Sequence, residues 1–358
     1  MKTYRAALIG CSRMGAFIDN EVNRDFAYSH AAGYEACDRT ELIACSDLRE
    51  DVMAVAGQRY DVPKAHQYTD YKDLIDTEKP DIVSVATQPE HRAEIVIYAA
   101  QKGVKAIYAE KAMAASMADA DAMVEACEAN GVFFNMGTNR RWDRGYDAMI
   151  EVINGGRIGK LKSVILHQTG SLFNTASHCL DLMMRLNGDQ PARSVQAQLT
   201  GGADAIEENV LKADPVGHGT IEFANGVTGY ALNSGRGLEA EAVGDAGVVT
   251  AFQNGGDWQV REVVDKDDRG RNVLGIGEFP VAPLSSSTVH LIEDLVHALD
   301  TGEPTRCGVR LAHANQELIF AFVESHQRGG ARVDLPLKDS VYRLARESGP
   351  RQPKFERE

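Results

Sequence analysis

Long apolar runs and closely spaced cysteines are both missing from this sequence. No stretch approaches the roughly 18 uncharged residues that a membrane span requires, so we expect no transmembrane segment. The six cysteines form no Cys-x-x-Cys pair and no zinc-type spacing, which excludes a zinc ribbon and predicts no metal site. Scattered cysteines of this kind are typical of buried thiols in a reducing compartment. They are Cys11, Cys37, Cys45, Cys127, Cys179 and Cys307.

Positive charge is also scarce. The chain has 38 Lys and Arg against 52 Asp and Glu, a formal net charge of −14, which argues against a nucleic-acid or anionic membrane partner. Hydrophobic residues at 44% and charged residues at 25% fit a soluble globular protein. The first five residues lead directly into an apolar run and leave no room for a signal peptide, so we expect a cytoplasmic protein.

The most informative stretch is the apolar run 6–9 followed by Gly10-Cys11-Ser12-Arg13-Met14-Gly15. A strand, a glycine turn and a helix in this order form the setting in which a dinucleotide pyrophosphate binds. The middle glycine of the usual fingerprint is Ser12 here, so the motif is a variant. An ordinary strand-to-helix turn is the alternative. We expect cofactor contacts from Gly10, Ser12, Arg13 and Met14.

A second apolar run, 41–46, ends in Asp47. An acidic residue at this place accepts hydrogen bonds from the adenosine ribose hydroxyls and repels a 2′-phosphate, so it favours NAD over NADP. Asp47 lies further from Gly15 than the usual spacing of about 20 residues, which predicts an insertion around 17–34. Arg49 could pair with a phosphate. A cap on the next helix is the alternative role of Asp47.

Strands and helices then alternate. The patterns predict strands at 81–87, 106–109 and 132–137, and helices at 93–102 and 117–129. Repeated β-α units indicate a doubly wound parallel sheet that binds its ligand at the carboxyl ends of the strands. The polar residues expected at these ends as cofactor contacts are Thr87, Pro89, His91, Glu110, Lys111 and Asn139.

The second part of the chain predicts a large, mostly antiparallel open sheet with flanking helices. Alternating patterns broken by turn residues occur at 160–170, 194–200, 219–223, 228–232, 247–252 and 258–264. Helices at 289–299 and 311–326 and a short strand at 332–336 follow. We expect a Rossmann domain at 1–138, a substrate-binding and oligomerisation domain at 139–337, and a polar tail at 338–358.

Together these features resemble the oxidoreductase family typified by glucose–fructose oxidoreductase and inositol dehydrogenase (Gfo/Idh/MocA), over nearly the whole chain. The resemblance rests on Gly10–Gly15, Asp47, Thr87-Gln88-Pro89-Glu90-His91, Ala109-Glu110-Lys111, Asn139-Arg140-Arg141, Gly159-Lys160-Leu161, Asn174-Thr175-Ala176-Ser177-His178 with Asp181, and the C-terminal Thr301-Gly302-Glu303-Pro304 and Leu335-Pro336. It implies an N-terminal Rossmann domain that binds NAD, with NADP the second choice, and a C-terminal sheet domain.

The resemblance also implies the catalytic residues. Lys111 would lie beside the nicotinamide, where burial next to a positive ring lowers an ammonium pKa and lets the group hold or move the substrate proton. Ala112 stands where the family has proline. His178 would act as general acid or base, with a core histidine as the alternative. Asn174 replaces the family's aspartate and would bind substrate or cap the helix.

Three further residues lie near these motifs. Arg141 and Trp142 are expected to line the substrate cleft, with one of the arginines there paired to a carboxylate such as Glu110. Asp181, one helical turn from His178, is expected to be structural.

The resulting hypothesis is hydride transfer between NAD and a secondary alcohol carbon of a sugar, glycoside or cyclic polyol. Two alternatives stay open. An enzyme that retains NAD could oxidise a sugar carbon transiently to ease elimination or glycoside cleavage, and a relative without catalysis could sense sugars or nucleotides. We also expect a homodimer or homotetramer formed through the C-terminal sheet, because broad apolar sheet faces are rarely left in water.

Overall fold

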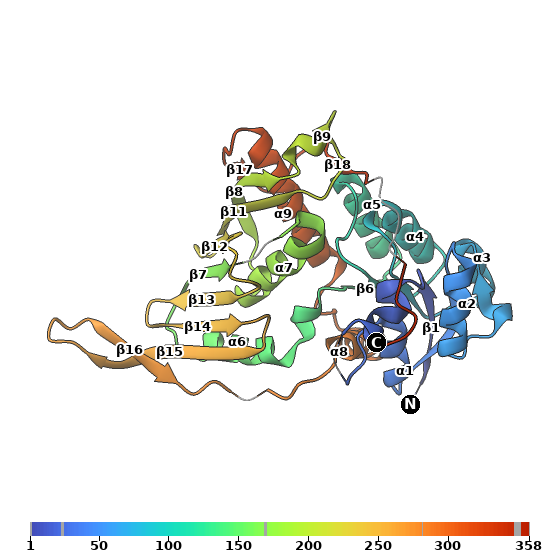
Figure 1. Ribbon diagram of the computed structural model, residues 1–358, viewed down its shortest axis with the longest axis horizontal. Coiled ribbons are helices and arrows are strands. Elements are labelled where there is room, and N and C mark those ends of the chain that lie inside the picture. Colours follow the sequence, from blue (N-terminus) through green and yellow to red (C-terminus); the bar gives the residue numbers. More distant parts are fainter. Residues whose placement is uncertain (1, 23–24, 168–169, 281, 347–351, 358) are drawn as a thin grey trace. The chain divides into compact units, whose positions relative to one another are not determined.

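The computed structural model describes residues 2–22, 25–167, 170–280, 282–346 and 352–357 (Figure 1). The chain divides into two compact units. The first combines Met1–Trp142, Ser285–His313 and Glu347–Glu358, and the second combines Asp143–Leu284 and Ala314–Arg346. No helix within the described ranges is long and apolar enough to cross a membrane.

The first unit is built on a six-stranded parallel sheet with strand order β3-β2-β1-β4-β5-β6. Its central strands are buried on both faces, which explains their nearly continuous apolar sequences. The order is that of a doubly wound sheet, so the expected Rossmann architecture is confirmed. The strands are β1 (Tyr4–Ile9), β2 (Thr40–Ser46), β3 (Gln67–Tyr68), β4 (Ile82–Val85), β5 (Ala106–Ala109) and β6 (Phe133–Met136).

Helices alternate with these strands, and their starts carry recognisable signals. The side chains of Asp70 and Ser116 accept hydrogen bonds from backbone N–H groups of the first turns of α3 and α5, and α4 begins with proline. The helices are α1 (His30–Ala36), α2 (Glu50–Arg59), α3 (Tyr71–Glu78), α4 (Pro89–Gln101) and α5 (Met117–Ala129), with short 3₁₀ turns η3 (Lys64–His66) and η4 (Asn139–Trp142).

The segment after the glycine turn differs from a regular first helix. It forms a π-helical turn η1 (Arg13–Phe17) and a 3₁₀ turn η2 (Ile18–Asn20), and α1 begins only at His30. The carboxylate of Asp19 accepts hydrogen bonds from the N–H groups of Tyr28 (2.7 Å) and Ser29 (3.0 Å), which closes the inserted loop. The wide spacing between the glycine turn and Asp47 therefore reflects this loop.

Helix α8 (Ser287–Thr301) belongs to the first unit. Its buried side chains Leu291, Ile292 and Leu295 lie in the same apolar cluster as the parallel strands, and α8 contacts α1, β5 and β6. The division expected from sequence placed this helix in the domain 139–337. The structure assigns it to the other unit because its apolar stripe matches the face of the parallel sheet.

The second unit contains a nine-stranded sheet with order β16-β15-β14-β13-β7-β12-β11-β8-β17. All neighbouring pairs are antiparallel except β7 with β12, so the expectation of a mostly antiparallel sheet is confirmed. The strands are β7 (Leu161–Leu166), β8 (Ala192–Gly201), β11 (Val216–Phe223), β12 (Thr228–Ala231), β13 (Ala240–Gly244), β14 (Gly247–Phe252), β15 (Asp257–Lys266), β16 (Asn272–Gly277) and β17 (Val333–Asp334).

Two helices pack on one face of this sheet. Helix α6 (Arg144–Asn154) packs against β14, and helix α7 (Ser177–Leu186) packs against β7 and β12. Helix α9 (Val309–Gln327) begins in the first unit and continues into the second. Alternate residues of β11 are buried and exposed, as expected for a sheet covered on one side.

The remaining elements are short. They are η5 (Leu172–Ala176), η6 (Ala203–Ala205), β9 (Ile206–Glu207), β10 (Val210–Leu211) and β18 (Arg343–Leu344). Strand β18 pairs with β10, so part of the tail expected at 338–358 is incorporated into the second unit.

Candidate functional site

The turn after β1 is built for glycine at both ends. Gly10 has φ +94°, and a Cβ at this position would lie 3.0 Å from the carbonyl carbon of Ala86. A Cβ at Gly15 would lie 2.0 Å from the carbonyl oxygen of Gly10, closer than any real contact. Ser12 is partly buried, Met14 is partly buried, and Arg13 is exposed and pairs with Glu21 at 2.7 Å. The close packing of the chain on itself thus requires glycine at both positions, and neither carries a side chain that could cover the backbone of the turn.

Asp47, which follows β2, reaches across to this turn. Its Oδ2 accepts a hydrogen bond from the N–H of Cys11 (2.8 Å), and its Oδ1 accepts one from the N–H of Arg49 (2.9 Å). The N-cap of α2 is Arg49, so Asp47 is not the cap that was its alternative role. Each carboxylate oxygen keeps a lone pair for a hydroxyl donor.

The end of β4 carries a buried hydroxyl. The Oγ1 of Thr87 has no hydrogen-bond partner among the residues that the structure describes. Pro89 starts α4, and His91 in the first turn is exposed. The next side chain, Arg92, is fully buried and donates to the carbonyls of Thr87 and Ala112, so it joins the loops that follow β4 and β5.

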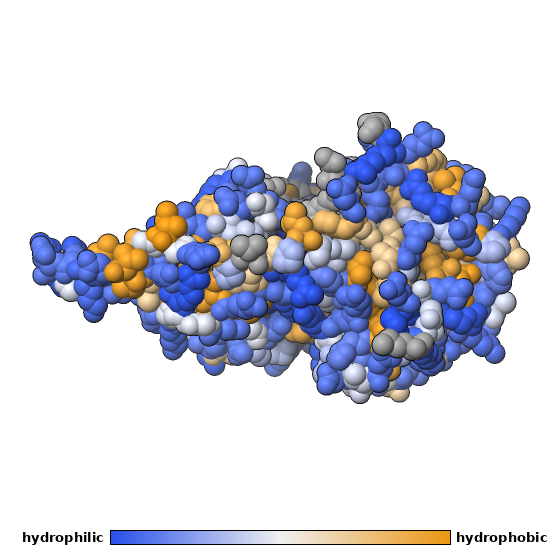
Figure 2. Space-filling model, turned by 90° about the horizontal axis from the view of Figure 1, so that it is seen from below, coloured by the Kyte–Doolittle hydropathy of each residue, from blue (hydrophilic) through white to orange (hydrophobic). Residues whose placement is uncertain are grey.

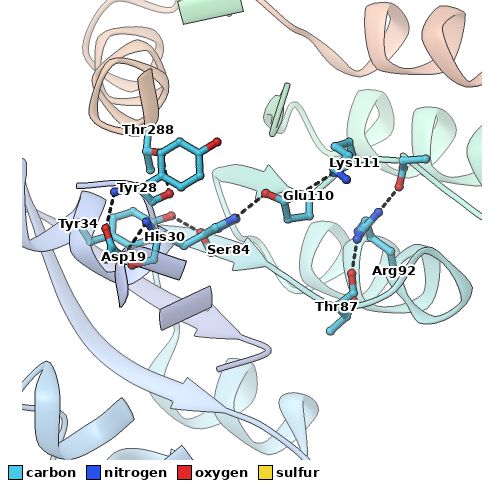
Figure 3. A network of polar contacts seen from close by, with 12 residues as sticks. Asp19, Tyr28, His30, Tyr34, Ser84, Thr87, Arg92, Glu110, Lys111 and Thr288 are labelled. Carbon is cyan, nitrogen blue, oxygen red and sulfur yellow. Dashed lines mark hydrogen bonds and ion pairs between the residues drawn. The ribbon is translucent and has the colours of Figure 1, made fainter. Parts of the chain in front are cut away.

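The end of β5 carries a buried acid in a polar network (Figure 3). Glu110 Oε1 lies 3.2 Å from Nε2 of His30, and the other imidazole nitrogen lies 2.9 Å from the hydroxyl of Ser84. The Ser84 hydroxyl also contacts the Tyr34 hydroxyl at 2.8 Å. The His30 ring stacks on Tyr108, with 3.7 Å between ring centroids.

The pKa of the Glu110 carboxyl is lowered despite its burial. Burial would raise the pKa of this carboxyl, but the hydrogen bond and charge of His30, with Lys111 and Arg92 nearby, lower the pKa below the ordinary value. Its carboxylate also accepts a hydrogen bond from the backbone N–H of Lys111 at 3.3 Å. The acid thus holds the backbone of the expected catalytic lysine.

Lys111 is partly buried, and the peptide bond between it and Ala112 is cis. Asn139 is partly buried in η4, whereas Arg141 and Trp142 are fully buried. Arg141 donates to the carbonyl of Arg306 at 3.3 Å, and Trp142 lies in the core cluster of the first unit. This burial gives Trp142 a packing role, and the lining of a substrate cleft by these two residues stays a prediction.

In the second unit, the turn η5 carries Asn174 just before α7. The carboxylate of Asp214 accepts hydrogen bonds from the N–H groups of Phe173 (2.9 Å) and Asn174 (3.0 Å). Burial raises the pKa of the Asp214 carboxyl in spite of these bonds. Asn174 is exposed and is not the N-cap, which is Ala176. The capping role considered for Asn174 is therefore wrong.

Helix α7 places His178 as its amphipathic pattern predicts. Cys179, Leu182, Met183 and Leu186 are all buried and fix the helix, while His178 on another face is only partly buried. Asp181 is fully buried. Lys111 lies in the first unit and His178 in the second.

Sequence reasoning missed four residues. His30 and Asp214 contact groups far away in the sequence, Arg92 contacts carbonyls 5 and 20 positions away, and no motif marks these three residues. His167, after β7, lies 2.9 Å from Glu241 and 3.1 Å from Arg236. Only the proximity of His167 to a strand end could have drawn attention to it.

Comparison with known proteins finds a family model that matches part of this chain and relatives that resemble it. The profile described as "Oxidoreductase family, NAD-binding Rossmann fold" matches residues 4–138. The chain is 26% identical to a myo-inositol 2-dehydrogenase of Thermotoga maritima over 321 residues, which are 84% of this chain and 89% of that protein. It is 33% identical to a D-apiose dehydrogenase of Paraburkholderia graminis over 160 residues, 44% of this chain and 38% of that protein.

Solved structures share the fold over both units. A levoglucosan dehydrogenase in complex with NADH and L-sorbose matches with a TM-score of 0.75 at 20% identity, covering 94% of this chain and 100% of that one. An aldose-aldose oxidoreductase from Caulobacter crescentus matches with a TM-score of 0.75 at 18% identity, covering 93% of this chain and 100% of that one.

Proposed function

We propose that this chain is an NAD-binding oxidoreductase of the Gfo/Idh/MocA family, and that it exchanges a hydride between NAD and a secondary alcohol carbon of a sugar, glycoside or cyclic polyol. The observation that carries the proposal is the position of Asp47, whose carboxylate binds the backbone of the glycine turn. A ribose hydroxyl donor and the pyrophosphate of a dinucleotide would then bind side by side.

The residues present fit a dinucleotide. Gly10 and Gly15 leave no room for a Cβ, so neither position carries a side chain that could cover the backbone of the turn, and the buried hydroxyl of Thr87 lacks a partner among the described residues. Gly10, Ser12, Arg13 and Met14 would hold the pyrophosphate, and Asp47 and Arg49 the adenosine ribose. Thr87, Pro89, His91, Glu110, Lys111 and Asn139 would lie along the nicotinamide half. The nicotinamide supplies the hydride acceptor when it is bound.

The chain itself supplies proton handling and orientation. The ammonium of Lys111 would donate a hydrogen bond to the reacting hydroxyl and take part in moving its proton. His178 would serve as the second acid or base, and Asn174 would hold a neighbouring hydroxyl through its amide. The ionised Glu110 would add negative charge near Lys111 and keep its backbone in place.

The substrate class and the choice of coenzyme are part of this proposal. A relative named for inositol and fold neighbours crystallised with sorbose or levoglucosan support a polyhydroxylated substrate. The acidic Asp47 supports NAD, because a carboxylate repels a 2′-phosphate.

The test is reduced-nicotinamide absorbance with NAD and then NADP across inositols, monosaccharides and simple glycosides. An increase with one substrate class supports the proposal. Substrate consumption without free NADH, with NAD recovered from denatured protein, would favour an enzyme that retains its coenzyme. Binding of sugar without turnover under any condition would favour a sensor.

We also propose that the C-terminal sheet forms a homo-oligomer. The hairpin of β15 and β16 exposes Val264 (61%), Ile276 (75%) and neighbouring apolar side chains. Figure 2 shows apolar atoms gathered along this projecting hairpin. A second copy of the same strands would cover them. Multi-angle light scattering should give a dimer or tetramer, with Ile276→Lys shifting the mass downward, and a monomeric full-length chain would contradict the proposal.

A further inference from the structure

The C-terminal segment Gln352–Arg357 packs on the first unit next to the glycine turn. The ring of Phe355 contacts Phe17 edge-on, with centroids 5.1 Å apart and planes at 80°. Phe17 is fully buried in the cluster that also contains Cys11 and Ala16 of the turn, and Phe355 packs against that cluster. Pro353 is buried as well. An apolar anchor therefore joins the end of the chain to the core beneath the turn.

Polar contacts fix the backbone of this segment. The amide of Asn20 donates to the carbonyl of Lys354 at 2.7 Å, and the guanidinium of Arg59 donates to the carbonyl of Phe355. Arg59 also donates to Asn20 Oδ1 at 3.3 Å and lies 4.9 Å from the Phe17 ring centroid. The backbone of the segment is thus held by Asn20 at the end of η2 and by Arg59 at the end of α2.

One side chain of the segment reaches the other edge of the same site. Arg49 Nη1 donates to Gln352 Oε1 at 3.3 Å, while Arg49 Nε lies 3.7 Å from Asp47 Oδ1. The guanidinium is therefore held from two sides, by the acid at the end of β2 and by the C-terminal segment.

We propose that the segment Gln352–Arg357 is part of the coenzyme site, and that Gln352 is a positioning residue which sets the preference for NAD over NADP. The inference rests on the proposed function. A guanidinium free to turn offers a 2′-phosphate a bidentate, charge-assisted partner. When its guanidinium is held between Gln352 and Asp47, Arg49 cannot turn toward a 2′-phosphate, so the site favours the ribose hydroxyl groups of NAD. Phe355 anchors the segment that carries Gln352.

The test measures dissociation constants for NAD and for NADP on the full chain by isothermal titration calorimetry. In Gln352→Ala the ratio of the NADP dissociation constant to the NAD dissociation constant should fall about fivefold, which is the net value of one ordinary hydrogen bond. Gln352→Glu, which keeps an acceptor for Arg49 and adds a carboxylate that repels a 2′-phosphate, should keep the ratio at or above that of the unmodified chain. Glu356→Gln is the matched control, because Glu356 is exposed in the same segment.

The anchor is tested separately. Phe355→Ala should lower the ratio by a similar factor, and Phe355→Leu provides an apolar replacement if the alanine variant unfolds. A ratio within twofold of the unmodified chain in both Gln352→Ala and the Phe355 variant would overturn the inference. If the unmodified chain binds neither coenzyme, the proposed function fails instead, so the two failures are distinguishable.

Discussion

Substitution of His30 or Glu110, which form a buried pair, should lower the free energy of unfolding by a measurable amount. In His30→Ala the Glu110 carboxylate keeps its burial and its backbone donor but loses the imidazole at 3.2 Å. Removing one partner of a buried pair costs about 3–5 kcal/mol, and loss of the Tyr108 stacking contact adds about 0.5–1.5 kcal/mol. Glu110→Gln should cost less, about 1–3 kcal/mol, because its amide keeps hydrogen-bonding capacity and carries no charge.

The assay must report on the first unit alone. The chain has 2 tryptophans, and Trp142 lies in the core cluster of that unit, whereas Trp258 belongs to the second. In a Trp258→Phe background, tryptophan fluorescence during urea unfolding follows the unit that contains the pair. The double variant His30→Ala/Glu110→Gln completes a cycle, with an expected coupling of about 1–3 kcal/mol. A His30→Ala cost below about 1 kcal/mol, or additive single effects, would refute the pairing.

The pH dependence has a definite sign. The pKa of Glu110 is lowered from 4.5 in the folded chain, so the unfolded chain binds the proton more tightly. The contribution of the Glu110 carboxylate to the free energy of unfolding is therefore fully present above pH 4.5, and it is lost as the pH falls through the lower pKa of the folded chain. The free energy of unfolding of Glu110→Gln should fall furthest below that of the unmodified chain near neutral pH, and this difference in free energy should become smaller in acid. A difference that stays constant from neutrality into acid would contradict the direction of the shift.

Three further predictions concern the proposed site. Lys111→Met should lower turnover by at least about 10²-fold. Lys105→Met, which changes an exposed lysine paired with Asp81, should leave turnover unchanged. Equal steady-state rates for the two variants would show that Lys111 takes no part in the reaction. Gly15→Ala should abolish NAD binding detectable by calorimetry, because its Cβ would lie 2.0 Å from the carbonyl oxygen of Gly10. Gly201→Ala, whose Cβ would lie 3.7 Å from the nearest atom, should bind NAD normally. Asp47→Asn should weaken NAD binding by about tenfold, through loss of a charged acceptor, and a fluorescence titration matching the unmodified chain would contradict that role.

Local sequence patterns predicted most of the parallel sheet. Helix α5 and strand β5 have the predicted bounds, because buried strands flanked by amphipathic helices leave strong periodic signals. Strands β13 and β16 were missed, because both are short and contain glycine, and because β16 exposes its apolar side chains instead of alternating buried and exposed residues. The stripe of α7 was predicted from the same periodicity that the structure shows.

The candidate site was predicted only where a motif marks it. The glycine turn and Asp47 were accessible because both act within a few residues of a strand end. His30 and Glu110 are 80 positions apart, and their contact depends on how α1 packs beside the sheet, which no local pattern encodes. The same holds for Arg92, whose buried guanidinium contacts two loop carbonyls, and for the C-terminal segment beside the turn.

The assignment of α8 to the first unit has a consequence for how the chain folds during synthesis. The parallel strands leave the ribosome long before Ser287–Thr301, yet Leu291, Ile292 and Leu295 complete the apolar cluster of that unit. A nascent chain that ends within the second unit therefore exposes the part of β5 and β6 that α8 later covers. Such an unfinished surface is a binding site for chaperones that recognise apolar segments. The apolar cluster of the first unit thus cannot be completed until Asp143–Leu284 of the second unit have been translated.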